Sequence, residues 1–143
     1  DCAYCSQTAS HNTKNAMAAS NIQKMFALMQ AHQKTFKKSG GSHAAALFNA
    51  NNTLLSIQED IGRHNAVDKV IGELLLKKQL NEATFMLVSG RVSYEIVSKA
   101  FIAKIPYVIA VSACSTLAVD FAKEFGITLI GFSRGKKATI YAN

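Results

Sequence analysis

The strongest constraint on the fold of this chain is a series of short apolar runs separated by helical patterns. Residues 85–88, 107–111 and 127–132 are largely apolar, which is typical of strands that are buried on both faces. Helical periodicity connects them at residues 92–104 and 116–125. Buried strands that alternate with helices predict an α/β fold, in which a largely parallel sheet is covered on both faces.

The N-terminal half of the chain adds a helix and a hairpin to this pattern. Apolar residues recur at mostly helical spacing over residues 14–38, and Ser39-Gly40-Gly41-Ser42 then interrupts the chain. Two short strands are predicted on either side of Asn51-Asn52. Further expected elements are a helix at 62–78 and a strand at 138–141. The 143 residues therefore predict one three-layer α/β/α domain with a mixed sheet over 14–143, after a mobile, thiol-bearing loop at 1–13.

Polar turns follow three of the predicted strands. They read Ser89-Gly90-Arg91, Ser112-Ala113-Cys114-Ser115 and Ser133-Arg134-Gly135. Ligands of open α/β sheets collect beyond the carboxyl ends of the strands. We therefore expect the three turns to share one edge of the sheet, where small residues leave room for a ligand and the arginines attract negative charge.

A dense polar block connects a strand to a helix at residues 60–65. It combines the acid Asp60, the flexible Gly62, the cation Arg63 and the imidazole of His64. Asp60 can simply cap the helix, and His64 can be a packed, hydrogen-bonded side chain. An arginine beside exposed helix N–H groups also suits a phosphate or another anion, and we favour this interpretation for the block as a whole.

The turn Ser133-Arg134-Gly135-Lys136-Lys137 is strongly basic. Backbone amides of a glycine turn, together with three cations, can hold a diphosphate; the alternative is a solvated hairpin. The whole chain has 16 Lys and Arg against 9 Asp and Glu, a net charge of +7, which favours an anionic partner. Without Trp or an aromatic basic stripe, nucleic acid is not the expected partner.

The chain contains three cysteines, and two of them form the C-x-x-C pair Cys2 and Cys5. Such a pair serves as a zinc half-site, a redox dithiol or a sulfur carrier, or occurs by chance. A zinc site needs further ligands, and no second C-x-x-C pair supplies them, so no metal site is predicted. Cys114, just after a predicted strand, could be a third thiol near a ligand, but the simpler expectation is a small hydrophobe. An odd cysteine count does not fit a disulfide scaffold and favours the cytoplasm; no apolar run is long enough to span a membrane.

Residues 59–69, which read Glu-Asp-Ile-Gly-Arg-His-Asn-Ala-Val-Asp-Lys, closely resemble the signature of the formate dehydrogenase accessory proteins, the FdhD-type sulfurtransferases. Further motifs of that family occur in family order, at residues 40–46, 89–95, 116–119 and 129–141. The resemblance thus covers nearly the whole chain. Family members carry an additional N-terminal region, so we expect this chain to be a piece of a longer protein.

The resemblance implies a function. The family receives sulfane sulfur from a cysteine desulfurase and passes it to a molybdenum or tungsten bis-guanylyl-pterin cofactor, Mo-bis(molybdopterin guanine dinucleotide), for apo-formate dehydrogenase. By the same resemblance, Cys2 would hold the persulfide. Cys5 would then accept the sulfur, assist its release or resolve the loop as a disulfide. The family's cofactor-binding turn corresponds to Phe132, Ser133, Arg134, Gly135, Lys136 and Lys137; from their predicted place at the sheet edge we add Arg63, His64 and Arg91. A homodimer is also implied.

This sequence departs from the family pattern at a few positions. Cys114 stands where the family usually has Pro, and Ala3 and Ser6 stand where Gly usually follows each cysteine. The predicted element order also resembles the cytidine deaminase fold, but the general-acid Glu and the zinc cysteines of that fold are absent.

Three functions therefore remain in competition. The leading hypothesis is a sulfurtransferase that relays a persulfide. The alternative is a chaperone that binds the cofactor and docks apo-formate dehydrogenase without chemistry of its own. A zinc-dependent deaminase is the third, and the missing Glu weighs against it.

Overall fold

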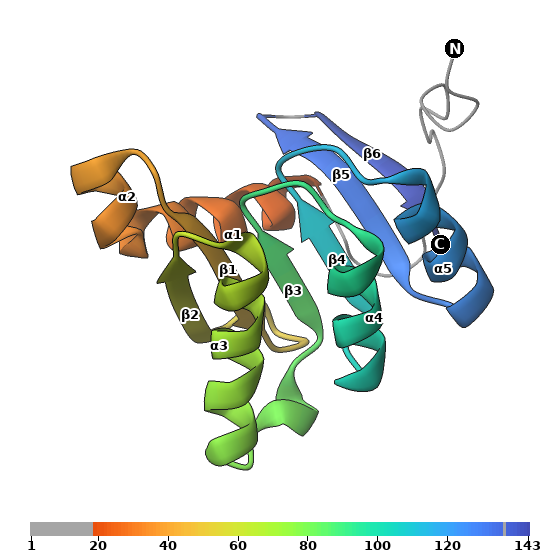
Figure 1. Ribbon diagram of the computed structural model, residues 1–143, viewed down its shortest axis with the longest axis horizontal. Helices are drawn as coiled ribbons and strands as arrows, with labels where there is room; N and C mark the ends of the chain where they lie inside the picture. The colour runs from red at the N-terminus through yellow and green to blue at the C-terminus, as the bar shows by residue number, and fades with distance from the viewer. Residues whose placement is uncertain (1–18, 136) are drawn as a thin grey trace.

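The computed structural model describes residues 19–135 and 137–143 (Figure 1). The predicted thiol loop at 1–13, with Cys2 and Cys5, lies outside the described residues, as does Lys136. The elements, in chain order, are α1 Ala19–His32, α2 Lys34–Ser39, β1 His43–Phe48, β2 Leu54–Asp60, α3 Arg63–Leu76, a 3-10 turn Leu80–Glu82, β3 Phe85–Val88, α4 Tyr94–Ile102, β4 Tyr107–Ala110, α5 Thr116–Phe125, β5 Thr128–Arg134 and β6 Lys137–Ala142.

The strands form one six-stranded mixed sheet in the order β2-β1-β3-β4-β5-β6. The parallel pairings lie in the centre, between β3 and β4 and between β4 and β5. Antiparallel pairings join β1 to β2 and to β3, and β5 to β6. The α/β fold with a mixed sheet that the sequence predicts is confirmed.

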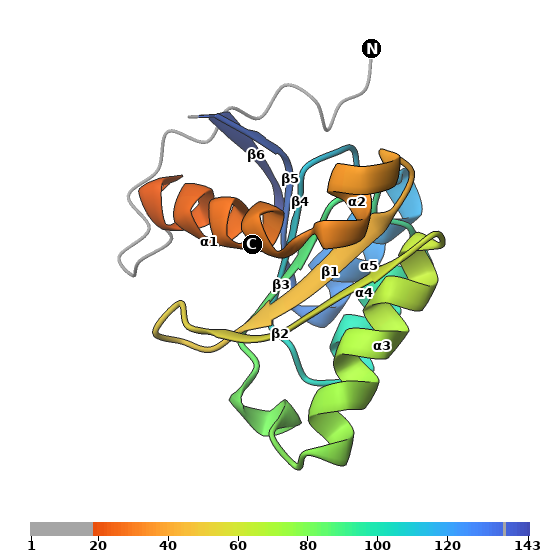
Figure 2. The ribbon, with the colours of Figure 1, turned by 90° about the vertical axis from the view of Figure 1, so that its left-hand side faces the viewer.

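Helices cover both faces of the sheet. Figure 2 shows α1 on one face and α3, α4 and α5 on the other. Two separate apolar clusters fill these layers. Met25, Met29 and Phe48 belong to the cluster under α1, whereas Leu74, Ile96 and Leu129 belong to the cluster under the other three helices. The three-layer arrangement follows from strands whose alternate side chains are apolar on both faces.

The single helix predicted at 14–38 is wrong in one respect, because the described part consists of two helices that meet at Gln33. Gln33 has φ −77° and ψ 73°, which is not helical. The backbone N–H groups of Thr35 and Phe36 donate to the Glu59 carboxylate, both at 2.9 Å. A carboxylate from β2 therefore caps a new helix start, and a partner 24 residues away in the sequence cannot be read from local periodicity.

The helix ends agree closely with the sequence. Gly126 ends α5 in the left-handed conformation, with φ 71°, which glycine adopts without steric cost. Ser115 begins the same helix, and its hydroxyl accepts a hydrogen bond from the Ala118 amide at 3.2 Å. The turn at 111–115 is consequently held in place from the helix side.

Candidate functional site

One edge of the sheet gathers the polar turns that the sequence singles out. Strands β3, β4 and β5 run parallel and end there. Because β1 is antiparallel to β3 and to β2, β1 begins at this edge and β2 ends there. It is the upper edge in Figure 1, beneath the loops that lead into α3, α4 and α5. The predicted convergence of the three turns on one edge is therefore confirmed by the sheet topology.

A cavity of about 480 Å³ lies between α1 and the basic turn. We call it the turn cavity. Helix α1 contributes Ile22 and Phe26, and the opposite wall includes Ser133, Arg134, Gly135 and Lys137. The Gln23 side-chain amide donates to the carbonyl of Gly135, which joins the helix to the turn.

The polar groups of the turn cavity are incompletely satisfied. Ser133 is 8% exposed, and its hydroxyl has no hydrogen-bond partner. Arg134 donates from Nε to the carbonyl of Val111 at 3.3 Å. Neither Arg134 nor Lys137 takes part in an ion pair within the described part of the chain. The cavity therefore offers two uncompensated cations and a free hydroxyl to an anionic ligand.

The backbone that carries this turn is strained. The pairing of β5 with β6 shifts register between Gly131 and Arg134. Within that bulge, Phe132 has φ 49°, an unfavourable value for an aromatic residue, and its side chain is 43% exposed. Bulges of this kind re-aim side chains near functional sites. Here the bulge places the Ser133 and Arg134 side chains in the wall of the turn cavity.

A second cavity, of about 610 Å³, continues along the other end of α1. Its lining includes Gly41, Ser42, His43 and Ser89, and we call it the loop cavity. Both cavities are also lined by Gln30 and Val111. Together they form one groove along α1, which we call the α1 groove.

Glu59 organises the wall of the loop cavity. Besides capping α2, its carboxylate accepts a hydrogen bond from the Ser42 hydroxyl at 3.0 Å. Burial alone would raise the pKa of Glu59, but the hydrogen bonds from Thr35, Phe36 and Ser42 outweigh it and lower the pKa. The carboxylate therefore stays ionised and holds α2 and the 40–43 loop against β2.

Asp60 shapes the turn before α3. Its carboxylate accepts from the Gly62 amide at 2.9 Å and from Asn65 Nδ2 at 3.1 Å, and it pairs with Lys69 at 2.6 Å. The hydrogen bond from Lys69, followed by those from Gly62 and Asn65, lowers the pKa of Asp60 to about 2. All of these partners are local, so Asp60 has a structural role in the turn; it accepts from the N-cap residue Gly62 and not from the amides of the first turn of α3, so the expected helix cap is not formed.

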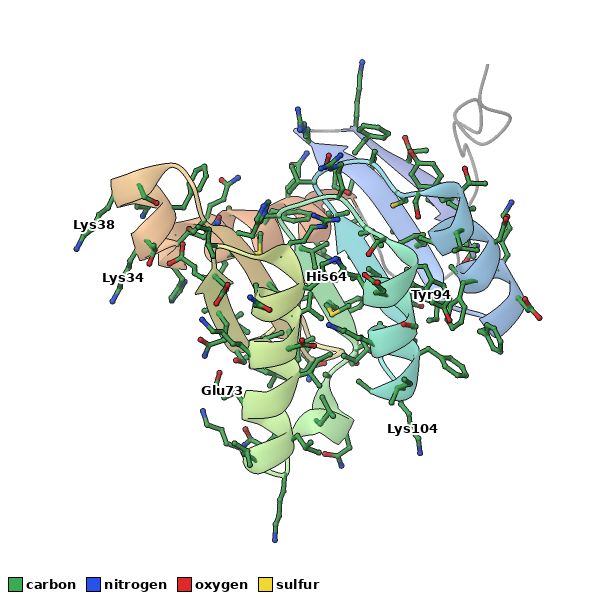
Figure 3. The ribbon with its side chains drawn as sticks, viewed as in Figure 1. Lys34, Lys38, His64, Glu73, Tyr94 and Lys104 are labelled. Atoms are coloured by element: carbon green, nitrogen blue, oxygen red, sulfur yellow. The ribbon has the colours of Figure 1, made fainter. Side chains whose placement is uncertain are left out.

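His64 lies between the N-terminal ends of α3 and α4, as Figure 3 shows. Its Nε2 is 3.4 Å from the Glu95 carboxylate. Neither cavity of the α1 groove includes His64 in its lining. His64 therefore lies apart from the basic turn at 133–137, although both are predicted from the sequence to belong to one cofactor site.

Arg63 and Arg91 meet in a third cavity, of about 260 Å³. We call it the arginine cavity; its remaining lining is Val92, Ser93, Ala113, Cys114 and Ser115. Gly90 separates it from the loop cavity. A Cβ at Gly90 would lie 3.1 Å from His43 Nδ1 and 3.4 Å from Arg63 Cδ, so a side chain there would push against the residues that line both cavities.

Cys114 is a partly buried thiol, packed against the apolar cluster under α3, α4 and α5. Burial raises its pKa to about 12, and a thiol that stays protonated is a poor nucleophile. The expectation that Cys114 is a small packed hydrophobe is consistent with this. The thiols expected to carry sulfur, Cys2 and Cys5, are outside the described residues.

Two kinds of feature are absent from the described part of the chain. Among residues 19–135 and 137–143, no group of three His, Cys, Asp or Glu side chains is arranged to hold a metal ion. No helix in that part of the chain has both the length and the apolar character needed to cross a membrane.

Sequence reasoning missed the contribution of α1 to the site. Gln23 and Gln30 look like ordinary surface residues of an amphipathic helix. Their place in the cavity walls depends on where α1 packs across the sheet, and no local pattern encodes that. Glu59 and Ser42 were part of the recognised motifs, but their mutual hydrogen bond was not predictable from spacing.

Known proteins of one family are similar to this chain in sequence and in structure. The family model described as FdhD/NarQ matches residues 3–143. The chain is 51% identical over 116 residues to the sulfur carrier protein FdhD of Saccharolobus solfataricus, covering 80% of this chain and 45% of that protein. It is 50% identical over 126 residues to its namesake in Mycolicibacterium paratuberculosis, covering 87% and 46%. The chain thus spans about half the length of these relatives. A crystal structure named as a formate dehydrogenase accessory protein from Desulfotalea psychrophila superposes with a TM-score of 0.81 at 29% identity, over 87% of this chain and 54% of that one.

Proposed function

Because this chain belongs to the FdhD/NarQ family, we propose that it is the cofactor-binding part of a sulfur carrier protein that serves formate dehydrogenase. The sulfur comes from a cysteine desulfurase. Its acceptor is Mo-bis(molybdopterin guanine dinucleotide), which is bound as a substrate and then delivered to apo-formate dehydrogenase. In this proposal the protein acts as a sulfurtransferase of the cytoplasm and not only as a chaperone.

The observation that carries the proposal is the α1 groove with a basic turn at one end. A guanine nucleotide needs an elongated cleft with cationic groups where its phosphates lie. Cavities of about 480 and 610 Å³ in series fall within the size range of small-molecule sites. The apolar wall from Ile22 and Phe26 suits the base, and Arg134 and Lys137 suit the diphosphate.

The sulfur chemistry is assigned to Cys2 and Cys5. The Cys2 thiolate attacks the terminal sulfur of a donor persulfide, and a new S–S bond forms as the donor S–S bond breaks. The donor leaves as a thiolate, so the step involves no net oxidation. The Cys5 thiolate then attacks the sulfur of Cys2. A Cys2–Cys5 disulfide forms as the bond to the outer sulfur breaks, and that sulfur leaves at the sulfide level for the bound cofactor.

Nucleotide binding tests the groove. Isothermal titration of guanosine diphosphate against the protein and its Arg134→Gln and Lys137→Gln variants is expected to show a loss of roughly 1.5–3 kcal/mol for each charge-assisted contact removed, which is about tenfold or more in Kd. Lys104→Gln is the matched control, since Lys104 lies at the opposite edge of the molecule (Figure 3). Equal affinity in all four proteins would refute the groove assignment.

Sulfur loading tests the relay. The full-length protein is incubated with a cysteine desulfurase and cysteine, and the added sulfur is located by peptide mass spectrometry. We expect one extra sulfur on Cys2, lost in Cys2→Ala, and no formate dehydrogenase activation by that variant. If Cys2→Ala activates formate dehydrogenase normally and binds the nucleotide normally, the sulfur relay is refuted and the protein acts as a chaperone.

A further inference from the structure

We propose that the arginine cavity is a second anion site, which binds one tetrahedral oxyanion of the phosphate class independently of the α1 groove. This inference goes beyond the proposed function, because it requires neither a nucleotide nor a thiol. It is based on four properties of the cavity: uncompensated charge, unpartnered donors, rigid walls and separation from the groove.

The charge of the cavity comes from two arginines. Arg63 and Arg91 both line it. The ion pairs formed among the described residues involve other cations, namely His64, Lys69, Lys77 and Lys99. Two arginines thus line one small cavity without a carboxylate partner among the described residues. An anion bound there can accept hydrogen bonds from both guanidinium groups and balance their charge.

Two buried polar atoms of the lining residues have no hydrogen-bond partner. Arg63 Nε and Ser93 Oγ are both inaccessible to solvent and form no hydrogen bond in the described structure. Unsatisfied buried donors are rare in folded proteins because each loses its hydration without compensation. Both atoms belong to residues that line the arginine cavity, and an anion bound there can accept from them once the side chains turn toward it.

The helix starts supply further donors. Ser93 and Ser115 are the N-cap residues of α4 and α5, and both line the cavity. The Ser115 hydroxyl is used in its cap, where it accepts from Ala118, whereas Ser93 makes no side-chain cap bond. The Ser93 hydroxyl is therefore not committed to a cap hydrogen bond. Glu95, the acid in the first turn of α4, is directed to His64.

The walls of the cavity are joined before any ligand binds. Val92 pairs with Cys114 in a parallel bridge. The Val92 amide donates to Ala113 at 3.0 Å, and the Ser115 amide donates to Val92 at 2.9 Å. The two loops that carry the cavity therefore hold a fixed separation, which lowers the entropic cost of binding.

Size and position separate this site from the groove. At about 260 Å³, the cavity is smaller than the roughly 300 Å³ at which small-molecule pockets begin, so it admits one phosphate-sized group with water but no nucleoside. None of its lining residues lines the turn cavity or the loop cavity. Both sites can consequently be occupied at once.

Titration with inorganic phosphate, followed by NMR or calorimetry, tests the proposal. We expect saturable binding whose Kd rises at least tenfold in Arg63→Gln and in Arg91→Gln, and measurably in Ser93→Ala. Lys104→Gln is the matched control, because it removes a cation at the opposite edge of the molecule (Figure 3) and is expected to leave phosphate affinity unchanged. Thermal melts verify that each variant is folded. If an arginine variant does not fold, Ser93→Ala, which deletes only one hydroxyl, tests the site in its place.

A competition experiment separates a free oxyanion from the phosphate of a nucleotide. Phosphate is titrated again in the presence of saturating guanosine diphosphate, and we expect the same Kd as in its absence. Displacement of phosphate by the nucleotide would overturn the independence of the site and assign the arginines to the nucleotide's own phosphates. Phosphate binding that is unaffected by Arg63→Gln and Arg91→Gln would overturn the site itself. Neither result depends on whether the groove binds nucleotide as proposed.

Discussion

Replacing Gly131 by alanine tests how tightly the edge of the sheet is packed. A Cβ at this position of β5 would lie 2.7 Å from Cε2 of Tyr141, 3.1 Å from Sγ of Cys114 and 3.1 Å from the carbonyl oxygen of Ser112. The carbonyl belongs to the 111–115 turn, which accepts a hydrogen bond from the Phe132 amide at 3.0 Å. It therefore cannot retreat without breaking that bond.

The magnitude follows from two opposing terms. Overpacking a buried site costs about 1–3 kcal/mol, and Tyr141, 5% exposed, has little room to move. Alanine also restricts the unfolded chain, which stabilises the protein by about 0.4–1 kcal/mol. The net expectation is a loss of about 1–2 kcal/mol, or about 0.5–1 M in the urea midpoint for a slope of about 2 kcal/mol per M.

Urea unfolding followed by circular dichroism measures this loss. Gly72→Ala is the matched control, because Gly72 lies inside α3 and a Cβ there meets no atom within 4 Å. That variant is expected to gain about 0.5–1 kcal/mol from helix propensity. If Gly131→Ala is as stable as the unmodified protein, or gains as much as Gly72→Ala, the packing argument is refuted.

Three further predictions concern individual side chains. Hydrogen bonds from Lys77, then Ser56 and Gln58, lower the pKa of Glu73 from 4.5 to about 2. The stability that the ionised carboxylate contributes is therefore present above pH 4.5 and is lost as the pH falls toward 2. Between pH 5 and pH 3, the free energy of unfolding measured in urea should consequently fall less for Glu73→Gln than for the unmodified protein. Cys114, with its raised pKa, should react with iodoacetamide at pH 8 far more slowly in the folded protein than in urea, and equal rates would contradict its burial. Glu59→Gln should lower the free energy of unfolding by about 1–3 kcal/mol, because three donors lose a charged acceptor; hydrogen exchange should then speed up at Thr35 and Phe36, and unchanged exchange there would count against the cap.

Much of the fold could be predicted from the sequence because its elements have strong local signals. The apolar runs at β3 and β4 and the helix Thr116–Phe125 agree with the structure to within a residue or two. The hairpin of β1 and β2 and the glycine end of α5 also follow from neighbouring residues. Local signals fail at Gln33, because the acceptor that starts α2 belongs to Glu59 on another element.

The candidate site was only partly predictable. Alternation of strands and helices predicts which turns share an edge, so Arg91 and Arg134 could be placed near the same end of the sheet. It does not determine which side of the sheet end each side chain occupies. The structure places Arg134 in the turn cavity and Arg63 with Arg91 in the arginine cavity, which divides a group of cations that looked like a single set.

The sequence by itself determined the class of fold, the family and the residue types available for an anion, because periodicity and motifs are properties of contiguous residues. Only the tertiary structure decided how those residues combine. The α1 groove exists because a helix from the N-terminal part of the chain packs beside a turn more than 100 residues away, as the bond from Gln23 to Gly135 shows. Packing of that kind depends on the complementary shapes of two apolar surfaces, and this information is distributed over the whole chain.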